Sequence, residues 1–202
     1  MTDNLAEKRF ERQLAFIMEL DKLKTVLRRT MLTDMSRREN SAEHSWHLTL
    51  MAMLLQEHAC EEVDISRVMR MLLVHDVVEI DAGDTFAYDA DGYVDKEARE
   101  RAAADRLFSL LPEDHAAELR ALWDEFEECA TPEARFAVAL DRLHPLLQNL
   151  HANGGTWRSH GVTLEQVLAR MEPIREACPA LWPWVDRMLN EVWVNGKLRE
   201  PW

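Results

Sequence analysis

A histidine and two acids occupy positions of an amphipathic segment where apolar residues are expected. The apolar stripe that runs from Ile65 through Leu72 has helical spacing, and its next members would fall near positions 75 and 76. The chain has His75 and Asp76 there, and Glu79 follows one turn later on the same face. Charge that faces a protein interior is costly unless it is paired or binds a metal. The segment therefore indicates a metal site.

Two other segments place similar side chains on faces that should be apolar. His44 and His47 lie on a helical face that Leu48 continues, and Asp141 interrupts the apolar stripe of a later segment. Each has a simpler interpretation by itself, because a single interior histidine is more often hydrogen-bonded to backbone than metal-bound, and Asp141 could pair with Arg142. Taken together, three segments that each direct histidine or aspartate inward favour a shared metal site.

Helical periodicity dominates the chain, so helices must position these residues. Asn40 is a predicted N-cap that forms a capping box with Glu43, and Asp64 and Thr163 are further predicted caps. Residues 81–94, with two glycines and four aspartates, form the longest clear loop before the C-terminal half. No strand is predicted. The predicted helices cover about residues 5–27, 41–60, 65–80, 95–111, 113–129, 131–151, 163–177 and 179–196.

The composition indicates an acidic helical domain. The 202 residues include Lys+Arg 24 and Asp+Glu 37, so the net charge is 24 − 37 = −13. Such a surface repels phosphate backbones and no basic tract offsets it, which argues against nucleic acid polymers as partners. An apolar share of 47% is enough for a sizeable core, and Gly 6 with Pro 7 leaves few turn residues. Long helices with short connections are the expected result.

The sequence also predicts a cytoplasmic protein. No apolar run approaches the roughly 18 residues of a membrane span, and the first ten residues, MTDNLAEKRF, are too polar for a signal peptide. Cys60, Cys129 and Cys178 are an odd number of cysteines without a CxxC pair, as expected for thiols in a reducing compartment. We expect no membrane partner.

The order of the candidate ligands carries a family resemblance. The sequence resembles the HD-domain metal-dependent phosphohydrolases through Glu-His-Ser-Trp-His at 43–47, His-Asp-Val-Val-Glu at 75–79 and Ala-Leu-Asp-Arg-Leu at 139–143. Arg29 and the Gly-Asp pair that ends at Asp84 make it similar to the branch that contains the bacterial 5′-deoxynucleotidase and its eukaryotic relatives. The resemblance implies an all-α fold.

That resemblance also implies how the chain is organised. A single HD domain over residues 1–202 would be a bundle of about 7–9 helices. Its motif-bearing core would cover about residues 15–175, and a Trp-rich helix at 179–196 would follow. Relatives often form dimers, and the apolar C-terminal helix could contribute to a contact between subunits, so we expect a homodimer.

The resemblance assigns one divalent metal ion to the candidate site. Two imidazoles and two carboxylates suit Mn²⁺, Co²⁺, Fe²⁺, Ni²⁺ or Zn²⁺, and residue spacing does not choose among these ions. His47 and His144 are candidates for further ligands only in a two-metal variant. The implied ligands are His44, His75, Asp76 and Asp141.

Three further residues match functional positions of the family. Glu79 matches the catalytic acid/base, with a solvated glutamate at a helix end as the alternative. Arg29 matches the arginine that contacts the substrate phosphate, and the adjacent Arg28 competes for that role. Asp84 matches an aspartate near the sugar, with an acidic surface turn as the alternative. The branch commonly has Trp after the arginine, whereas this chain has Thr30, which bears on selectivity for 2′-deoxy sugars.

The resulting functional hypothesis is an enzyme. It would hydrolyse nucleoside 5′-monophosphates, and more specifically 2′-deoxynucleoside 5′-monophosphates, to nucleoside and phosphate. One alternative is an HD phosphohydrolase that acts on a nucleoside triphosphate or a cyclic phosphodiester. Another is a non-catalytic nucleotide-binding module whose metal only ties three helices together.

Overall fold

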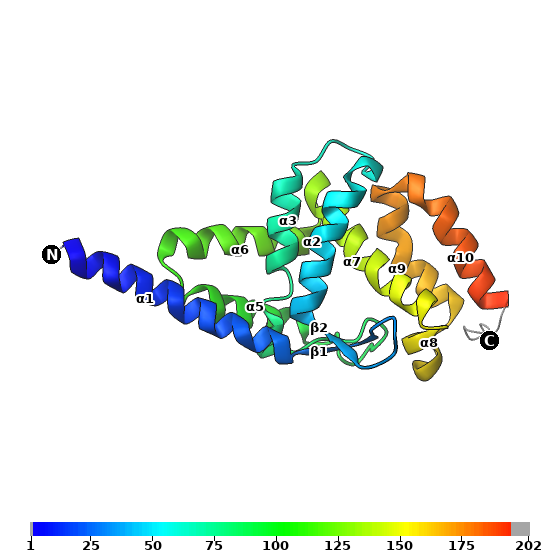
Figure 1. Ribbon diagram of the computed structural model, residues 1–202, viewed down its shortest axis with the longest axis horizontal. Coiled ribbons are helices and arrows are strands. Elements are labelled where there is room, and N and C mark those ends of the chain that lie inside the picture. The colour runs from blue at the N-terminus through cyan, green and yellow to red at the C-terminus, as the bar shows by residue number, and fades with distance from the viewer. Residues whose placement is uncertain (1, 195–202) are drawn as a thin grey trace.

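The computed structural model describes residues 2–194, and its all-α class confirms the expectation from the sequence. Among these residues, nine α-helices have six or more residues, and α4 adds a single turn. Figure 1 shows α1 extending from one end of the molecule and α10 lying at the opposite end. The helices are α1 (Thr2–Leu20), α2 (Ser41–Leu55), α3 (Ile65–Val74), α4 (Glu79–Ala82), α5 (Lys96–Phe108), α6 (Glu113–Glu128), α7 (Pro132–His151), α8 (Gly155–His160), α9 (Leu164–Ala177) and α10 (Trp182–Val194).

A short β-hairpin lies where the sequence predicted only helix and loop. Helix α1 ends at Leu20, a 3₁₀ turn follows, and β1 (Leu27–Met31) pairs antiparallel with β2 (Arg38–Asn40). The prediction of helix to about residue 27 and of no strand is therefore wrong here. The two strands have five and three residues, too few for a clear alternation of apolar and polar side chains in the sequence. The hairpin is instead stabilised by the packing of β1 beside α7 and α8.

The three predicted N-caps are confirmed. The side chain of Asn40 accepts a hydrogen bond from the Glu43 amide at 2.9 Å, and the Glu43 carboxylate accepts one from the Asn40 amide at 2.7 Å. Asp64 caps α3 through the amides of Ser66 and Arg67. Thr163 forms the expected capping box at the start of α9. These caps fix where the site-bearing helices begin.

Helix α3 ends earlier than the apolar stripe suggested. It stops at Val74, residues 75–78 form a turn, and α4 begins at Glu79. The amide of Glu79 donates to the carbonyl of Asp76 within this turn. A continuous helix over 65–80 was therefore a wrong prediction, although both segments are helical. In a regular helix, the side chains of adjacent residues point about 100° apart. The turn instead allows them to converge on one point.

The core lies around α7. This helix packs against α2, α3, α6 and α9, and its side chains Phe136 and Leu140 are almost fully buried. A second apolar cluster, which includes Leu107 and Trp123, joins α1, α5 and α6. No helix of the described residues is long and apolar enough to cross a bilayer.

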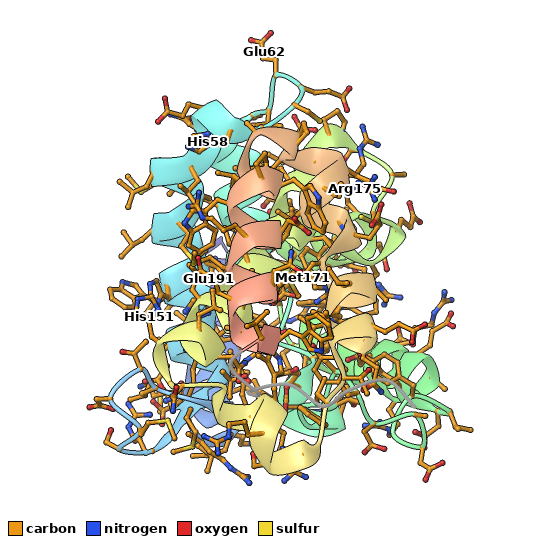
Figure 2. All side chains as sticks on the ribbon, turned by 90° about the vertical axis from the view of Figure 1, so that its right-hand side faces the viewer. His58, Glu62, His151, Met171, Arg175 and Glu191 are labelled. Atoms are coloured by element: carbon orange, nitrogen blue, oxygen red, sulfur yellow. The ribbon has the colours of Figure 1, made fainter. Side chains whose placement is uncertain are left out.

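Of the two C-terminal helices, α9 packs along α7, and α10 packs against α9. Figure 2 shows α10, with Glu191 labelled, lying in front, and α9, with Met171 and Arg175, beside it. The predicted Trp-rich helix forms as α10, while positions 195 and 196 of that prediction lie outside the described residues. Between α7 and α9, where the sequence predicted no helix, lies the short helix α8, whose first turn is held by Asn149 Oδ1 through the amide of Thr156 at 2.8 Å.

Candidate metal centre

Two helices and the turn that follows a third bring the four predicted ligands together. His44 lies in the first turn of α2, His75 and Asp76 lie in the turn after α3, and Asp141 lies midway along α7. All four are buried, and His44 has no exposed surface. His44 Nε2 lies 2.9 Å from Asp141 Oδ1, and His75 Nε2 lies 3.0 Å from Asp76 Oδ1.

Their donor atoms surround one point. One donor atom each from His44, His75 and Asp141 lies within 4.8 Å of the others. Asp76 joins this group because its Oδ2 lies 3.9 Å from His44 Nε2. Two imidazole nitrogens and two carboxylates at this spacing match the donor set of a divalent transition-metal ion.

The imidazole of His75 is oriented as a metal ligand. Its Nδ1 lies 2.8 Å from the carbonyl oxygen of Leu72, which can only accept a hydrogen bond, so the ring hydrogen is on Nδ1 in the neutral form. Its Nε2 is buried without a hydrogen-bond partner and faces the carboxylate of Asp76. An unpartnered buried nitrogen next to acidic oxygens fits a bound cation. The residues present therefore fit the metal that the family resemblance implies.

The charges of the site favour a cation in the same way. Burial alone would lower the pKa of His75, but Asp76 and Asp141 raise it to about 9. Burial alone would raise the pKa of Asp76, but His75 and Arg28 lower it to about 2. The pKa of Asp141 also falls well below its ordinary value, because Arg142 and His44 outweigh the effect of burial. The two carboxylates are thus ionised and attract positive charge.

Arg28 is the arginine that reaches this centre. Its Nη1 lies 3.0 Å from Asp76 Oδ2 and 4.0 Å from Asp84 Oδ1. Arg29 is exposed because successive residues of β1 face opposite sides, and among the described residues its side chain has no hydrogen bond or ion pair. The structure therefore brings Arg28 to the site, while Arg29, the arginine that the sequence suggested, borders the adjoining cavity, and its contact with a substrate phosphate stays a prediction.

Glu79 and Asp84 both lie at the centre. Glu79 is 7% exposed, and the hydroxyl of Ser41 donates a hydrogen bond to its Oε2 at 2.6 Å. Burial and the nearby charge of Asp76 raise the pKa of Glu79 well above its ordinary value, although Arg28 opposes them. Burial likewise raises the pKa of Asp84. Neither acid is a solvated surface group.

A cavity of about 310 Å³ opens from the metal centre. Besides Arg28 and Arg29, its wall includes Arg142, Arg170 and the acid Glu127. Burial and repulsion by Arg142 lower the pKa of Arg170, whereas burial raises the pKa of Glu127. Aromatic side chains complete the wall. These are Phe86, Tyr88, Tyr93, Phe126 and Trp157.

Two residues of the site were not identified from the sequence. These are Ser41, which donates a hydrogen bond to Glu79, and Arg170, which lines the cavity. Ser41 could have been noticed, because it immediately follows the predicted cap of α2. Arg170 had no signal, since it reaches the cavity from α9, about thirty residues after the last motif. The hairpin that turns Arg28 inward was also not predicted.

Comparison with known proteins now identifies the family. A family model described as HD domain matches residues 20–182. The chain belongs to the HD-domain family. The four candidate ligands, Glu79 and Asp84 all fall within the matched residues.

Named relatives and a solved structure agree with this family. The chain is 32% identical over 136 residues to "5′-deoxynucleotidase HDDC2" of Homo sapiens, and 34% identical over 112 residues to the protein of that name from Xenopus laevis. These matches cover 67% and 55% of this chain, and they span 65% and 54% of the relatives' own lengths. A crystal structure of a "predicted metal-dependent phosphohydrolase" from Magnetospirillum magnetotacticum MS-1 is 54% identical, with a TM-score of 0.91 over 97% of this chain and 98% of the other.

Proposed function

We propose that the protein hydrolyses nucleoside 5′-monophosphates, in particular those with 2′-deoxyribose, to nucleoside and phosphate. The observation that carries this proposal is the convergence of four metal-ligand side chains, a buried acid and a partly buried arginine at the end of one cavity. The names of the human and frog relatives support the same substrate class.

The metal ligands would be His44, His75, Asp76 and Asp141, with the ion being Mn²⁺, Co²⁺, Fe²⁺, Ni²⁺ or Zn²⁺. Such an ion supplies Lewis acidity toward water and toward the phosphoryl oxygens when it is bound. Hydrolysis breaks the bond between phosphorus and the 5′-oxygen and forms a bond from the oxygen of water to phosphorus. The leaving 5′-oxygen then needs a proton.

Glu79 is suited to supply that proton. Its raised pKa favours the protonated form of the carboxyl group, and the hydrogen bond from Ser41 holds Oε2 in a fixed direction. A positioned carboxylic acid can donate to the leaving oxygen as the P–O bond breaks. After the transfer, the carboxylate can take up a hydrogen from the incoming water, which restores the starting state.

Arg28 and Asp84 would orient the substrate. The guanidinium of Arg28 is held by Asp76 on one side, and its remaining N–H groups can bind phosphate oxygens. We assign it the phosphate role that the sequence suggested for Arg29. Asp84, 4.0 Å from Arg28, keeps its proposed place near the sugar. The cavity beyond offers aromatic faces on which a nucleobase can stack.

A nucleotide panel tests the proposal directly. Protein loaded separately with Mn²⁺ and Co²⁺ should release inorganic phosphate from 2′-deoxynucleoside 5′-monophosphates, and faster than from the corresponding ribonucleotides. E79Q should retain its metal and lose about 100-fold or more of the turnover, the usual contribution of general acid catalysis. No phosphate from any monophosphate with either ion would refute the proposal, whereas pyrophosphate or a linear monophosphate would identify a different substrate.

We also propose a homodimer, as the sequence suggested. Large apolar side chains are exposed on α2, including Trp46 and Leu54 at 60% and 74%, and Ile17 and Met18 are exposed on α1. Burying them against a second copy would remove apolar surface from water. Light scattering during size-exclusion chromatography should give twice the chain mass, and a single-chain mass would contradict this. The cytoplasmic location remains a prediction.

A further inference from the structure

A second group of metal-ligand side chains lies beside the first centre. Among residues 2–194, donor atoms of Glu39, His47 and His144 lie within 4.8 Å of one another. They come from three elements, because Glu39 lies in β2, His47 in α2 and His144 in α7. None of the three is among the ligands of the first centre.

The distances within this group suit a small cation. His144 Nε2 lies 2.9 Å from His47 Nδ1 and 3.7 Å from Glu39 Oε1. Ligand atoms at about 2.0–2.2 Å from a tetrahedral zinc ion lie roughly 3.4 Å apart, so the group needs only small shifts to hold one. Two imidazoles with one carboxylate form a known zinc donor set that leaves a position for water.

The carboxylate of Glu39 is incompletely satisfied. It is 2% exposed, and Oε1 accepts a hydrogen bond from Gln148 at 2.8 Å, but Oε2 has no hydrogen-bond partner. Arg28 Nε, 3.4 Å from Oε2, offers charge without a hydrogen bond. The oxygen nearer the group is Oε1, 3.7 Å from His144 Nε2, and beside its hydrogen bond from Gln148 it retains a lone pair that can bind a cation. Gln148 meanwhile fixes its orientation, as outer residues of metal sites do.

We propose that Glu39, His47 and His144 form a second binding site for a divalent transition-metal ion, with Zn²⁺ as the best-suited ion. His47 is exposed whereas the other two residues are buried, so the site opens to solvent through His47. The ion has an entry path that does not cross the cavity of the first centre.

The two sites share a hydrogen between their histidines. His44 Nδ1 and His144 Nδ1 lie 2.9 Å apart, which requires that one of the two nitrogens carry the hydrogen and the other accept it. If each site held an ion, each neutral ring would bind its ion through Nε2 and carry its hydrogen on Nδ1. The two Nδ1 hydrogens would then clash. Glu39 Oε2, 3.4 Å from His44 Nδ1, is an alternative acceptor if the ring turns. Filling one site should therefore weaken the other.

Metal stoichiometry tests this site without any measurement of turnover. Protein stripped with a chelator, incubated with excess Zn²⁺ and desalted would be analysed for zinc per chain by mass spectrometry. The wild type should hold two ions and His47→Ala one. His151→Ala is the matched control, because it removes an exposed histidine from α7 that belongs to neither group, and it should hold two. His151 is labelled in Figure 2.

A second pair of variants assigns the remaining ion. Asp76→Asn removes a ligand of the first centre only, so adding His47→Ala to it should lower the zinc content by one further ion, whereas adding His151→Ala should not. Circular dichroism would verify that each variant is folded. A wild type with one ion, or a His47→Ala variant with as much zinc as the wild type, would overturn the proposal, and neither result depends on whether the nucleotidase proposal is correct.

Discussion

At the scale of single residues, the neighbouring arginines of β1 show what a sequence motif leaves undetermined. Arg28 and Arg29 have the same chemistry, and without the hairpin nothing in the sequence decides which one faces inward. Strand geometry decides it, since adjacent residues face opposite sides. The buried ligands were predictable because charge on an apolar stripe has few explanations, whereas a choice between identical neighbours needs the local backbone.

Substitution of each arginine tests this assignment. Arg28→Lys keeps the charge but loses the planar fork, so kcat/KM should fall roughly 10- to 100-fold, the value of one or two charge-assisted hydrogen bonds to phosphate. Arg29→Lys serves as the control and should stay within about twofold of wild type, because that side chain is exposed. Steady-state kinetics with one good monophosphate measures both. Equal losses in the two variants would contradict the assignment to Arg28.

Ser41 is predicted to position Glu79 rather than to touch substrate. Its hydrogen bond lowers the pKa of Glu79, against the upward effects of burial and Asp76. In Ser41→Ala that pKa should rise further, and the acid form would persist to higher pH. The alkaline limb of the kcat profile should therefore move upward in pH while kcat at its optimum falls. An unchanged limb would exclude this role, and Ser41→Thr should restore the wild-type profile.

At the scale of elements, the capped helix starts were predictable and the interruptions were not. Asn40 and Asp64 predict the starts of α2 and α3, because each side chain accepts a hydrogen bond from a backbone amide no more than three residues later. The end of α3 at Val74 has no such local signal, because the apolar stripe continues past it to Ile80. The interruption places His75 and Asp76 at a turn where the tertiary contacts of the metal centre determine the backbone.

Substitutions of the N-caps Asn40 and Asp64 should distinguish an effect on stability from an effect on metal affinity. Asn40→Ala and Asp64→Ala should each lower the free energy of unfolding by about 1 kcal/mol, because each removes an N-cap. Only the Asn40 cap lies within about one turn of the proposed metal ligand His44, so only Asn40→Ala should also weaken metal binding. Chemical denaturation of the metal-free proteins and titration with Co²⁺ give the two quantities. Equal metal affinity in the two variants would show that the start of α2 does not set the position of His44.

At the scale of the whole molecule, the acidic character has two origins. A net charge of −13 makes the surface a poor match for polyanions. Two carboxylates, however, are buried with two histidines, and we propose that there they bind a cation instead of contributing to solubility. A cation bound at that point would be a link between α2, α7 and the turn after α3, so its binding energy adds to the free energy of unfolding.

This link predicts opposite pH dependences for the metal-free and the metal-bound protein. The folded-state pKa of His75 is raised to about 9 from an ordinary value near 6.5, so its interaction with Asp76 stabilises the metal-free fold fully below about pH 6.5 and is lost as pH rises through 9. The shift in the pKa of His75 corresponds to roughly 3 kcal/mol of stabilisation of the metal-free fold. The lowered pKa of Asp76 reports the same interaction, so this free energy is counted only once. Metal must displace the His75 proton, so affinity should increase over the same pH interval. Thermal unfolding at pH 6, 7.5 and 9, with a chelator and with excess Co²⁺, should show the metal-dependent rise in Tm growing with pH; a rise that shrinks would mean that the ion does not replace a proton on His75.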